Sequence, residues 1–465
     1  MIKLTFVCQD GVTVPDLMDL VRAYSPHVVE EEGAPLLAVE PQDLGNGFAV
    51  TIDYAGKTWS AEQADASIDP IVRRRHYKRF VKRTVYFVLK ELTEVTLPYG
   101  SLTGIRPTKL YYDLLSEGYD PKAQLRDYFD VTPQKIELIE DIVAAQKGIY
   151  KVDLDRYDQF ANIPVCPTRC AYCSFIAQVY GSVKKQIPLY ADNVAKEVGD
   201  FFDLGVARRA IYVGGGTPTA IPAVELDKIL AAFRAKGEEF TVEAGRPETL
   251  TKEMVDVMLS RGVTRVSVNP QTFKQATLAK IGRAHTVDDV LRAYDLVRDT
   301  PLDVNMDLIA MLPDESMDDF AHSVEKAIEL GAANITVHSL SIKRGSTLNL
   351  MGYDNALNND LALRMSEYAY HRLKEAGYVP YYMYRQKNTE GRLENVGYTR
   401  KGHACTYNVD IMEETHSIHA SGAGAISKRV FDEEGRIERL AEIKEVKGFN
   451  ERVEELRAKK RVFFA

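Results

Sequence analysis

The chain has 465 residues, of which 45% are hydrophobic and 27% charged, and its formal net charge is -8. This composition is ordinary for a soluble globular protein of two to three domains, and its acidic balance argues against a general nucleic-acid binder. No apolar run reaches the roughly 18 residues of a membrane-spanning helix. The N-terminus carries no signal-peptide pattern, so we expect a cytoplasmic protein.

Residues 1–150 are expected to form an N-terminal α+β accessory domain. Alternating side chains predict strands over 2–7 and 48–54, and helices are predicted over 69–92, 109–116 and 133–146. The helix 69–92 carries a run of basic residues: Arg73, Arg74, Arg75, Lys78, Arg79, Lys82 and Arg83. Such a run is either a solvated helix face or a docking face for an anionic partner or substrate.

Residues 151–377 alternate between short β-rich runs and amphipathic helical stretches. The predicted strands are 161–165, 210–213, 240–243, 265–268, 304–309 and 334–340, and the predicted helices are 187–204, 224–235, 252–260, 287–298, 317–330 and 356–376. This repetition predicts parallel strands with right-handed crossovers, which make a partial (β/α)6 TIM-like barrel. Its chemistry is expected at the C-terminal ends of the strands. Residues 378–465 are expected to form a mixed α/β segment on the substrate side.

Three of the five cysteines form the pattern Cys166-x3-Cys170-x2-Cys173. Three thiolates on one tight loop can ligate three corners of a cubane iron–sulfur cluster and leave the fourth iron open. A zinc site would need a fourth ligand, for which Cys405 or His403 is the alternative. Clustered cysteines in a reducing compartment favour metal binding over disulfides.

Two further patterns follow the cysteines. Tyr212 to Thr219 reads as a strand that ends in three glycines, which either free the backbone for a ligand or make a tight turn. Polar residues then occur at or near later strand ends: Glu243, Gln271, Arg283 and Asp307. Polar side chains there are either satisfied within the barrel or used for binding.

Residues 162–175, with Tyr172 just before the third cysteine, resemble the cluster loop of radical S-adenosylmethionine (SAM) enzymes. They are similar to the oxygen-independent coproporphyrinogen III oxidase (dehydrogenase) group. The resemblance implies a 4Fe–4S cluster on Cys166, Cys170 and Cys173, with one or two SAM molecules and an open iron for SAM. It implies cofactor-binding roles for Phe160, Tyr172, Gly215, Gly216, Thr217, Glu243, Gln271, Arg283 and Asp307.

The chain departs from members that make protoporphyrinogen. Phe160 stands where they carry Tyr, Asn162 where they carry His, and Ser174 and Phe175 follow the third cysteine. The Cys-x-Phe ending is shared with a haem-chaperone branch. The N-terminal extension, residues 104–107 and the aromatic stretch 381–388 resemble a coproporphyrinogen dehydrogenase-like branch.

The resemblance implies oxidative decarboxylation of coproporphyrinogen III propionates to vinyl groups, in haem and porphyrin biosynthesis. The alternatives are a haem-binding or haem-trafficking protein and a radical SAM enzyme with another substrate, such as haem. A one-electron donor such as a flavodoxin or ferredoxin is the expected partner. A tetra-anionic substrate needs cationic partners, for which the candidates are Arg344, Arg385, Arg400 and Lys401. The segment 422–425 is expected either to shape the substrate side or to form a turn.

Overall fold

The computed structural model describes residues 4–10, 13–24, 34–102, 106–175, 177–342, 345–351, 353, 359–386, 393–431 and 436–465. The chain divides into two compact units, Met1–Asp141 and Ile142–Ala465. No helix within the described residues has both the length and the apolar character needed to cross a membrane.

The first unit is an α+β structure around a four-stranded sheet. Its elements are β1 (Thr5–Cys8), α1 (Val14–Tyr24), β2 (Leu36–Asp43), β3 (Gly47–Tyr54), β4 (Lys57–Ala64), α2 (Pro70–Thr93), α3 (Pro107–Ser116), α4 (Pro121–Ala123), the π-helical turn η1 (Gln124–Tyr128) and α5 (Pro133–Ala145), in which the division between units falls. The sheet order is β1-β2-β3-β4, and only the β1–β2 pair is parallel. The strands β2 and β4 and the helix α1 were not among the predicted elements.

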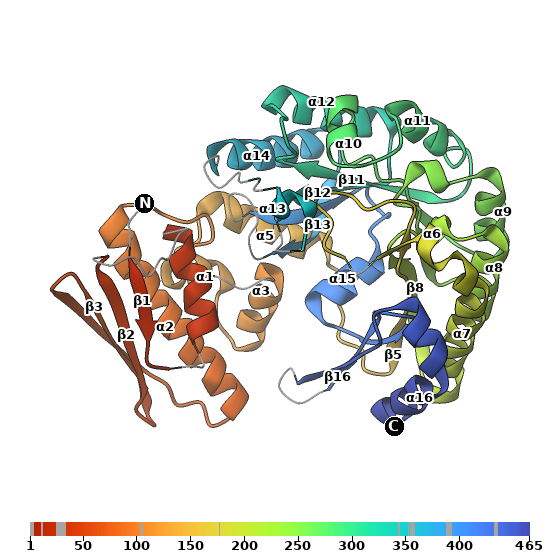
Figure 1. Cartoon of the computed structure of the whole chain (residues 1–465). Helices are drawn as coiled ribbons and strands as arrows, with labels where there is room; N and C mark the ends of the chain where they lie inside the picture. The colour runs from red at the N-terminus through yellow and green to blue at the C-terminus, as the bar shows by residue number, and fades with distance from the viewer. Residues whose placement is uncertain are drawn as a thin grey trace. The chain divides into compact units, whose positions relative to one another are not determined.

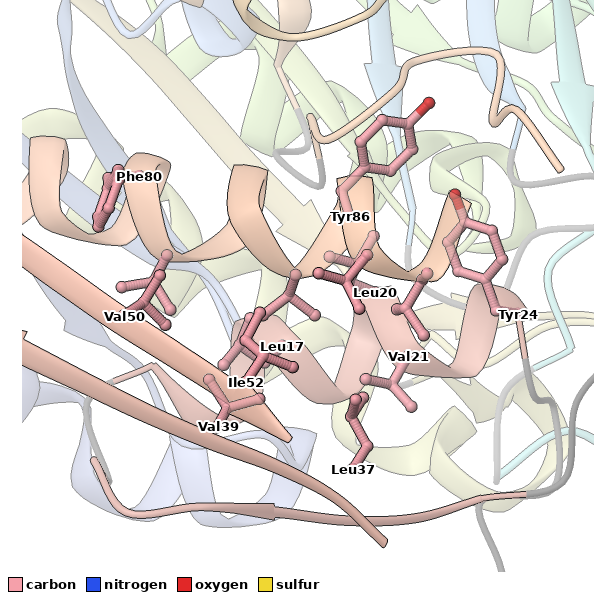
Figure 2. Close-up of a cluster of buried hydrophobic side chains, with 14 of the residues drawn as sticks. Leu17, Leu20, Val21, Tyr24, Leu37, Val39, Val50, Ile52, Phe80 and Tyr86 are labelled. Atoms are coloured by element: carbon pink, nitrogen blue, oxygen red, sulfur yellow. The ribbon is translucent and has the colours of Figure 1, made fainter. Parts of the chain in front are cut away.

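The core of this unit lies between the sheet and the helices α1 and α2 (Figure 2). Asp69 caps α2, since its side chain accepts hydrogen bonds from the N–H groups of Ile71 and Val72. The apolar face of α2 then buries Phe80 and Tyr86 against the sheet and α1. The other faces of α2 carry its basic side chains, of which Arg74 is exposed and the rest are half-buried.

The second unit is an open barrel whose strands belong to one 11-stranded sheet. These strands are β5 (Arg156–Ile163), β8 (Ala207–Gly215), β9 (Glu239–Glu243), β10 (Arg265–Ser267), β11 (Asp303–Ala310), β12 (Asn334–Ser339), β13 (Val379–Arg385), β14 (Glu394–Thr399), β15 (Ser417–Ser421), β16 (Ile426–Val430) and β17 (Ile437–Ala441). The order is β13-β14-β12-β11-β10-β9-β8-β5-β15-β16-β17. The run from β5 to β12 is parallel throughout, which confirms the predicted partial (β/α)6 barrel.

Helices cover the outside of this arc of strands (Figure 1). The helices of this unit are α6 (Tyr180–Val183), α7 (Ile187–Asp200), α8 (Ala223–Ala232), α9 (Lys252–Ser260), α10 (Gln275–Lys280), α11 (Val287–Asp295), α12 (Met317–Leu330), α13 (Thr347–Leu350), α14 (Asn359–Glu375), α15 (Thr406–Glu413) and α16 (Val446–Phe464). Short 3-10 turns are η2 (Lys184–Gln186), η3 (Phe201–Leu204), η4 (Pro218–Ala220) and η5 (Pro247–Thr249). The helix α15, which was not among the predicted elements, lies inside the arc rather than outside it.

The segment 378–465 contributes strands to both edges of the barrel sheet. On one edge β14 pairs antiparallel with β12 and with β13. On the other edge β15 pairs parallel with β5, and β16 and β17 extend the sheet antiparallel. The segment therefore continues the barrel sheet instead of standing as a separate layer.

Candidate functional site

The cysteine loop begins at the C-terminal end of β5 and is held by the glycine turn that follows β8. β6 (Val165–Cys166) carries the first cysteine and pairs with β7 (Gln178–Val179). Gly216 N donates to Ile163 O at 2.9 Å, and Thr217 N donates to Val165 O at 2.7 Å. A Cβ atom on Gly216 would lie 2.6 Å from Val165 O, so only glycine allows this approach. These two N–H groups are thus engaged by the cysteine loop and hold its start against the glycine turn.

The sulfur atoms of Cys166 and Cys170 each receive a hydrogen bond from another part of the barrel. Thr217 Oγ1 donates to Cys166 Sγ at 3.5 Å, and Arg246 Nη1 donates to Cys170 Sγ at 3.5 Å. Burial raises the pKa of the Cys166 thiol, and the Thr217 hydrogen bond opposes that rise. Donors that point at cysteine sulfur are the outer contacts that tune iron–sulfur clusters.

Arg246 was not predicted, and it ties the cysteine loop to the barrel. Its guanidinium is buried, donates to Thr168 Oγ1 at 2.9 Å and pairs with Glu248 Oε1 at 2.6 Å. Glu248 Oε2 lies 2.9 Å from Nδ1 of the buried His285. Burial raises the pKa of Glu248, but hydrogen bonds from His285 and Arg246 outweigh it and hold the pKa at about 2. In the sequence, Arg246 carries no signal beyond its place three residues after Glu243.

Glu243 ends β9 on the inner face of the barrel. Tyr212 on the neighbouring strand β8 donates its hydroxyl to Glu243 Oε1 at 2.5 Å. Burial raises the pKa of the Glu243 carboxyl to about 7; the Tyr212 hydrogen bond lowers it, and the charge of Asp307 raises it. A carboxyl group with this pKa changes its charge near neutral pH.

Asp307 on β11 belongs to a second set of polar side chains on the same inner face of the barrel. Asn269 Nδ2 donates to Asp307 Oδ2 at 2.8 Å, and His338 Nε2 on β12 lies 3.6 Å from that oxygen. The other ring nitrogen of His338 is 3.3 Å from the Tyr384 hydroxyl on β13. The structure thus adds His338 and Tyr384 to the predicted residues, through contacts between strands distant in the sequence.

Gln271 and Arg283 both lie in the segment that follows β10, and the Arg283 guanidinium contacts the chain just beyond the C-terminal ends of β9 and β10. Gln271 adopts a left-handed backbone conformation, φ 66°, and its N–H donates to Asp307 O at 2.9 Å. Within the described part of the chain, its Oε1 atom is buried without a hydrogen-bond partner. Arg283 is buried and donates to the carbonyl oxygens of Asn269 and Gly245. The Arg283 guanidinium therefore links the ends of β9 and β10 through these two carbonyl oxygens. The Oε1 atom of Gln271 can still accept a hydrogen bond.

The two aromatic residues of the predicted site differ in their surroundings. Phe160 stacks in the barrel interior on Tyr212, with ring centroids 6.2 Å apart, and on Tyr407 of α15, with centroids 6.3 Å apart. Tyr172 lies in the cysteine loop, where burial raises its pKa and the charge of Arg283 opposes that rise. Tyr172 is thus the aromatic side chain beside the cysteines, whereas Phe160 belongs to the interior stack.

The donor set suits an iron–sulfur cluster better than zinc. No group of three His, Cys, Asp or Glu side chains closes a metal site within the described residues. The three thiols nevertheless share one loop, with donors directed at two of the sulfurs. Cys405 Sγ lies 3.3 Å from Glu239 Oε1, at the first residue of β9, and His403 pairs with Asp303. The zinc alternative is wrong for both, because they lie at the N-terminal ends of β9 and β11, whereas the cysteine loop follows the C-terminal end of β5 in the same parallel sheet.

The cationic residues that were predicted to bind the substrate lie at opposite ends of β14. Thr399 pairs with Asn334, the first residue of β12, so Arg400 and Lys401 lie beyond the N-terminal end of that strand. Their prediction as partners of a substrate at the C-terminal ends is therefore wrong. Arg385 pairs with Glu394 at the opposite end of β14, and Arg344 lies outside the described residues.

Residues 163–327 match the radical SAM superfamily. HemZ of Bacillus subtilis (strain 168), an oxygen-independent coproporphyrinogen-III oxidase-like protein, is 38% identical over 417 residues, which cover 84% of this chain and 83% of HemZ. The heme chaperone HemW of Escherichia coli (strain K12) is 27% identical over 313 residues, 64% of this chain and 76% of HemW.

Among solved structures, coproporphyrinogen III oxidase (HemN) from Escherichia coli, a radical SAM enzyme, shares this fold. The TM-score is 0.52 and the identity 17%, and the match covers 67% of this chain and 72% of HemN. The radical SAM fold implies a 4Fe–4S cluster and SAM. The chain therefore belongs to the radical SAM superfamily and, within it, to the family of oxygen-independent coproporphyrinogen-III oxidase-like proteins that includes HemZ.

Proposed function

We propose that this protein is a radical SAM oxidoreductase that converts propionate side chains of coproporphyrinogen III to vinyl groups without oxygen. The observation that carries the proposal is the cysteine loop, whose sulfur atoms Cys166 Sγ and Cys170 Sγ accept hydrogen bonds from Thr217 and Arg246 at the ends of the neighbouring strands. The similarity to HemZ, an oxidase-like protein, supports the substrate class.

Each part of the site has a role in this reaction. Cys166, Cys170 and Cys173 hold three irons of the cluster, and the donors on their sulfurs offset its negative charge. When bound, the reduced cluster and SAM would together supply a radical that removes a hydrogen atom from a propionate side chain; loss of CO2 and of one electron to an external acceptor would then give the vinyl group. The hydrogen bonds that Gly216 N and Thr217 N donate to Ile163 O and Val165 O fix the start of the cysteine loop and so position its ligands.

SAM and substrate are positioned by a group of polar side chains inside the barrel, which we call the polar floor: Glu243, Gln271 and Asp307. Glu243, when ionised, accepts hydrogen bonds from the SAM ribose, and Tyr212 holds its carboxylate in place. Gln271 offers its buried Oε1 atom as a further acceptor. Arg385 lies at the same end of the sheet, and we assign to it the binding of a substrate carboxylate. A flavodoxin or ferredoxin supplies the electron that reduces the cluster.

The test is an anaerobic turnover assay with reconstituted protein, SAM, a reductant and coproporphyrinogen III. We expect 5′-deoxyadenosine and vinyl-bearing tetrapyrrole to form together, as measured by mass spectrometry. A Cys170→Ser variant is the matched control and should yield neither product. Deoxyadenosine formation without any change of the tetrapyrrole contradicts the substrate assignment and leaves the radical chemistry standing.

A second candidate is haem binding without oxidase turnover. It is favoured by the similarity to the heme chaperone HemW and by Ser174 and Phe175, which follow the third cysteine where oxidases of the group often carry another cysteine. A haem titration followed by absorbance distinguishes the two functions. A saturable Soret shift, with no vinyl product in the turnover assay, favours the haem-binding function.

A further inference from the structure

The chain that follows the cysteine loop returns to the first of the three cysteines. Gln178 and Val179 form β7, which pairs with β6, so that Val179 stands directly beside Cys166. Neighbouring strands lie about 4.8 Å apart. Val179 is 43% exposed, so a protein that touches it from outside is one strand away from a cluster ligand. The outer side of the cysteine loop therefore offers a short path to Cys166.

Large apolar side chains are exposed on the same stretch of the chain. Phe175, which closely follows Cys173, is 66% exposed, and Leu189, in the first turn of α7, is 53% exposed. Together with Val179, they place three exposed apolar side chains near the cysteines. Apolar side chains that are exposed together mark the centres of protein–protein interfaces, which polar and charged groups surround.

The start of α16 packs beside this stretch. The N–H group of Val446 donates to Gln178 Oε1 at 2.9 Å, and Asn450 Nδ2 donates to the carbonyl oxygen of Gln186 at 3.2 Å. The first contact involves the residue next to Val179, and the second involves the end of η2. Residues 177–186 and 444–451, which are far apart in the sequence, therefore adjoin each other beside the cysteine loop.

These two segments are positively charged, although the whole chain carries a net charge of -8. Lys447 Nζ lies 3.8 Å from Glu451 Oε1. Lys184, Lys185 and Lys444 are exposed, and within the described residues none of the three forms an ion pair. The charged residues of the two segments are Lys184, Lys185, Lys444, Glu445, Lys447 and Glu451. Four lysines against two glutamates leave an excess of two positive charges, which attracts an acidic protein to this place on an otherwise acidic chain.

We propose that a small acidic protein that delivers single electrons docks on this part of the second unit, which we call the carrier face. The inference rests on the proposed function, because a radical SAM reaction needs one electron at the cluster for each cleavage. The lysines steer the acidic partner, and the apolar side chains hold it against β7, beside Cys166. Redox encounters of this kind bury less than about 1,200 Å², so a few lysines around an apolar centre are enough. The carrier face consists of Phe175, Val179, Lys184, Lys185, Leu189 and Lys444.

The test is an anaerobic stopped-flow measurement of cluster reduction in the full chain, loaded with its cluster and saturated with SAM. The probe is a reduced flavodoxin with a strongly acidic surface. Lys184→Glu/Lys185→Glu should slow this reduction about 10-fold or more at low salt, because electrostatic steering raises association rates by about 10- to 1,000-fold. The matched control is Lys236→Glu/Lys401→Glu, which makes the same charge change at exposed residues near the N-terminal ends of the strands and should keep the wild-type rate.

Reduced methyl viologen serves as the second reductant. It is a small cation that needs no docking surface, so neither double variant should slow its reaction with the cluster. With flavodoxin, the difference between the two double variants should disappear at about 1 M salt, where the Debye length is about 3 Å. The single variant Lys444→Glu tests the second segment independently, should Lys184→Glu/Lys185→Glu fail to take up the cluster.

Three results overturn the proposal. The first is an equal rate of reduction by flavodoxin in the carrier-face variant and its control, whether slowed or not. The second is an equal slowing of the carrier-face variant with methyl viologen, which would place the effect at the cluster itself. The third is a wild-type dimer in sedimentation that the carrier-face variant dissociates, which would make a second copy of this chain the occupant.

A failure of the proposed function has a different signature. If methyl viologen drives formation of 5′-deoxyadenosine but coproporphyrinogen III gains no vinyl group, the substrate assignment is contradicted. The rates of cluster reduction by flavodoxin do not depend on that substrate, so the carrier face stands or falls on them alone.

Discussion

Replacing Glu243 with Gln should stabilise the protein at alkaline pH. Below its ordinary pKa of 4.5, Glu243 holds a proton in both the folded and the unfolded chain. Between 4.5 and about 7, the unfolded chain releases that proton, while burial keeps the folded carboxyl neutral. The contribution of Glu243 to stability is therefore complete at low pH and is lost as the pH rises through 7. Glutamine has no such charge to bury.

The size of this effect follows from the pKa of Glu243. A rise of about 2.5 over the ordinary value corresponds to about 3.4 kcal/mol when titration is complete. At about pH 5.5 only about 1.4 kcal/mol of this is lost, and at about pH 8.5 nearly all of it is lost. The advantage of the glutamine variant should therefore grow by about 2 kcal/mol between these two conditions, as an upper limit, because Glu243 is only half-buried.

The assay is urea unfolding followed by far-ultraviolet circular dichroism at both pH values. Tryptophan fluorescence is unsuitable, because the only tryptophan, Trp59, lies in β4 of the first unit and does not report on the barrel. Glu253→Gln, an exposed position on α9, serves as the control and should show no such change. If the difference between wild type and Glu243→Gln is the same at both pH values, or is larger at low pH, the reasoning is refuted.

Three further predictions concern the cluster and the barrel wall. Replacing any one of Cys166, Cys170 and Cys173 with Ser should abolish iron and sulfide binding in reconstituted protein, whereas Cys8→Ser in the first unit should retain both. Arg246→Gln should lower the reduction midpoint of the cluster, since it removes a cationic donor from Cys170 Sγ; an unchanged potential in a redox titration would show that this contact is not made in the loaded protein. Asp200→Asn should destabilise the packing of α16 on α7 by about 2–4 kcal/mol at neutral pH, because Arg457 loses its bidentate partner. Burial raises the pKa of Asp200, but hydrogen bonds from Arg457 outweigh burial and hold that pKa below its ordinary value. The difference in stability between wild type and Asp200→Asn should therefore disappear as the pH falls through the lowered pKa of the folded protein, as urea midpoints would show.

The elements that the sequence predicts best are those with local signals. The observed bounds of α9 and α12 equal the predicted ranges, because each helix has its own cap: Thr251 accepts from Met254 N, and Ser316 forms a capping box with Asp319. The parallel barrel strands were predicted in the same way, from apolar runs between amphipathic helices. By contrast, β15 pairs with β5, far away in the sequence, and its residues Ser417–Ser421 include few strand-forming side chains.

The candidate site shows the same limit at the level of single residues. Spacing alone predicts the three cysteines, and polar side chains in or at the ends of apolar strands predict Glu243 and Asp307. Nothing local marks Arg246, whose contact with Cys170 joins positions 76 residues apart. The same holds for Tyr384, which reaches His338 across β14 through the order of strands in the sheet. Contacts of this kind are fixed by topology, which a pattern of residue types does not reveal.

The position of α15 determines from which side a ligand can reach the polar floor. Cys405, its capping residue, and Tyr407 in its first turn pack into the barrel against Ala210, Ala420 and the inner strands. Glu239 at the start of β9 accepts from the N–H groups of Thr406 and Tyr407, which fixes the helix at the N-terminal ends of the strands. Because α15 fills that end, we expect a ligand to reach Glu243 from the C-terminal ends of the strands, where the cysteine loop and Arg246 lie. Glu243 is half-buried at that end, whereas Cys405 at the filled end is fully buried, which agrees with this direction of approach.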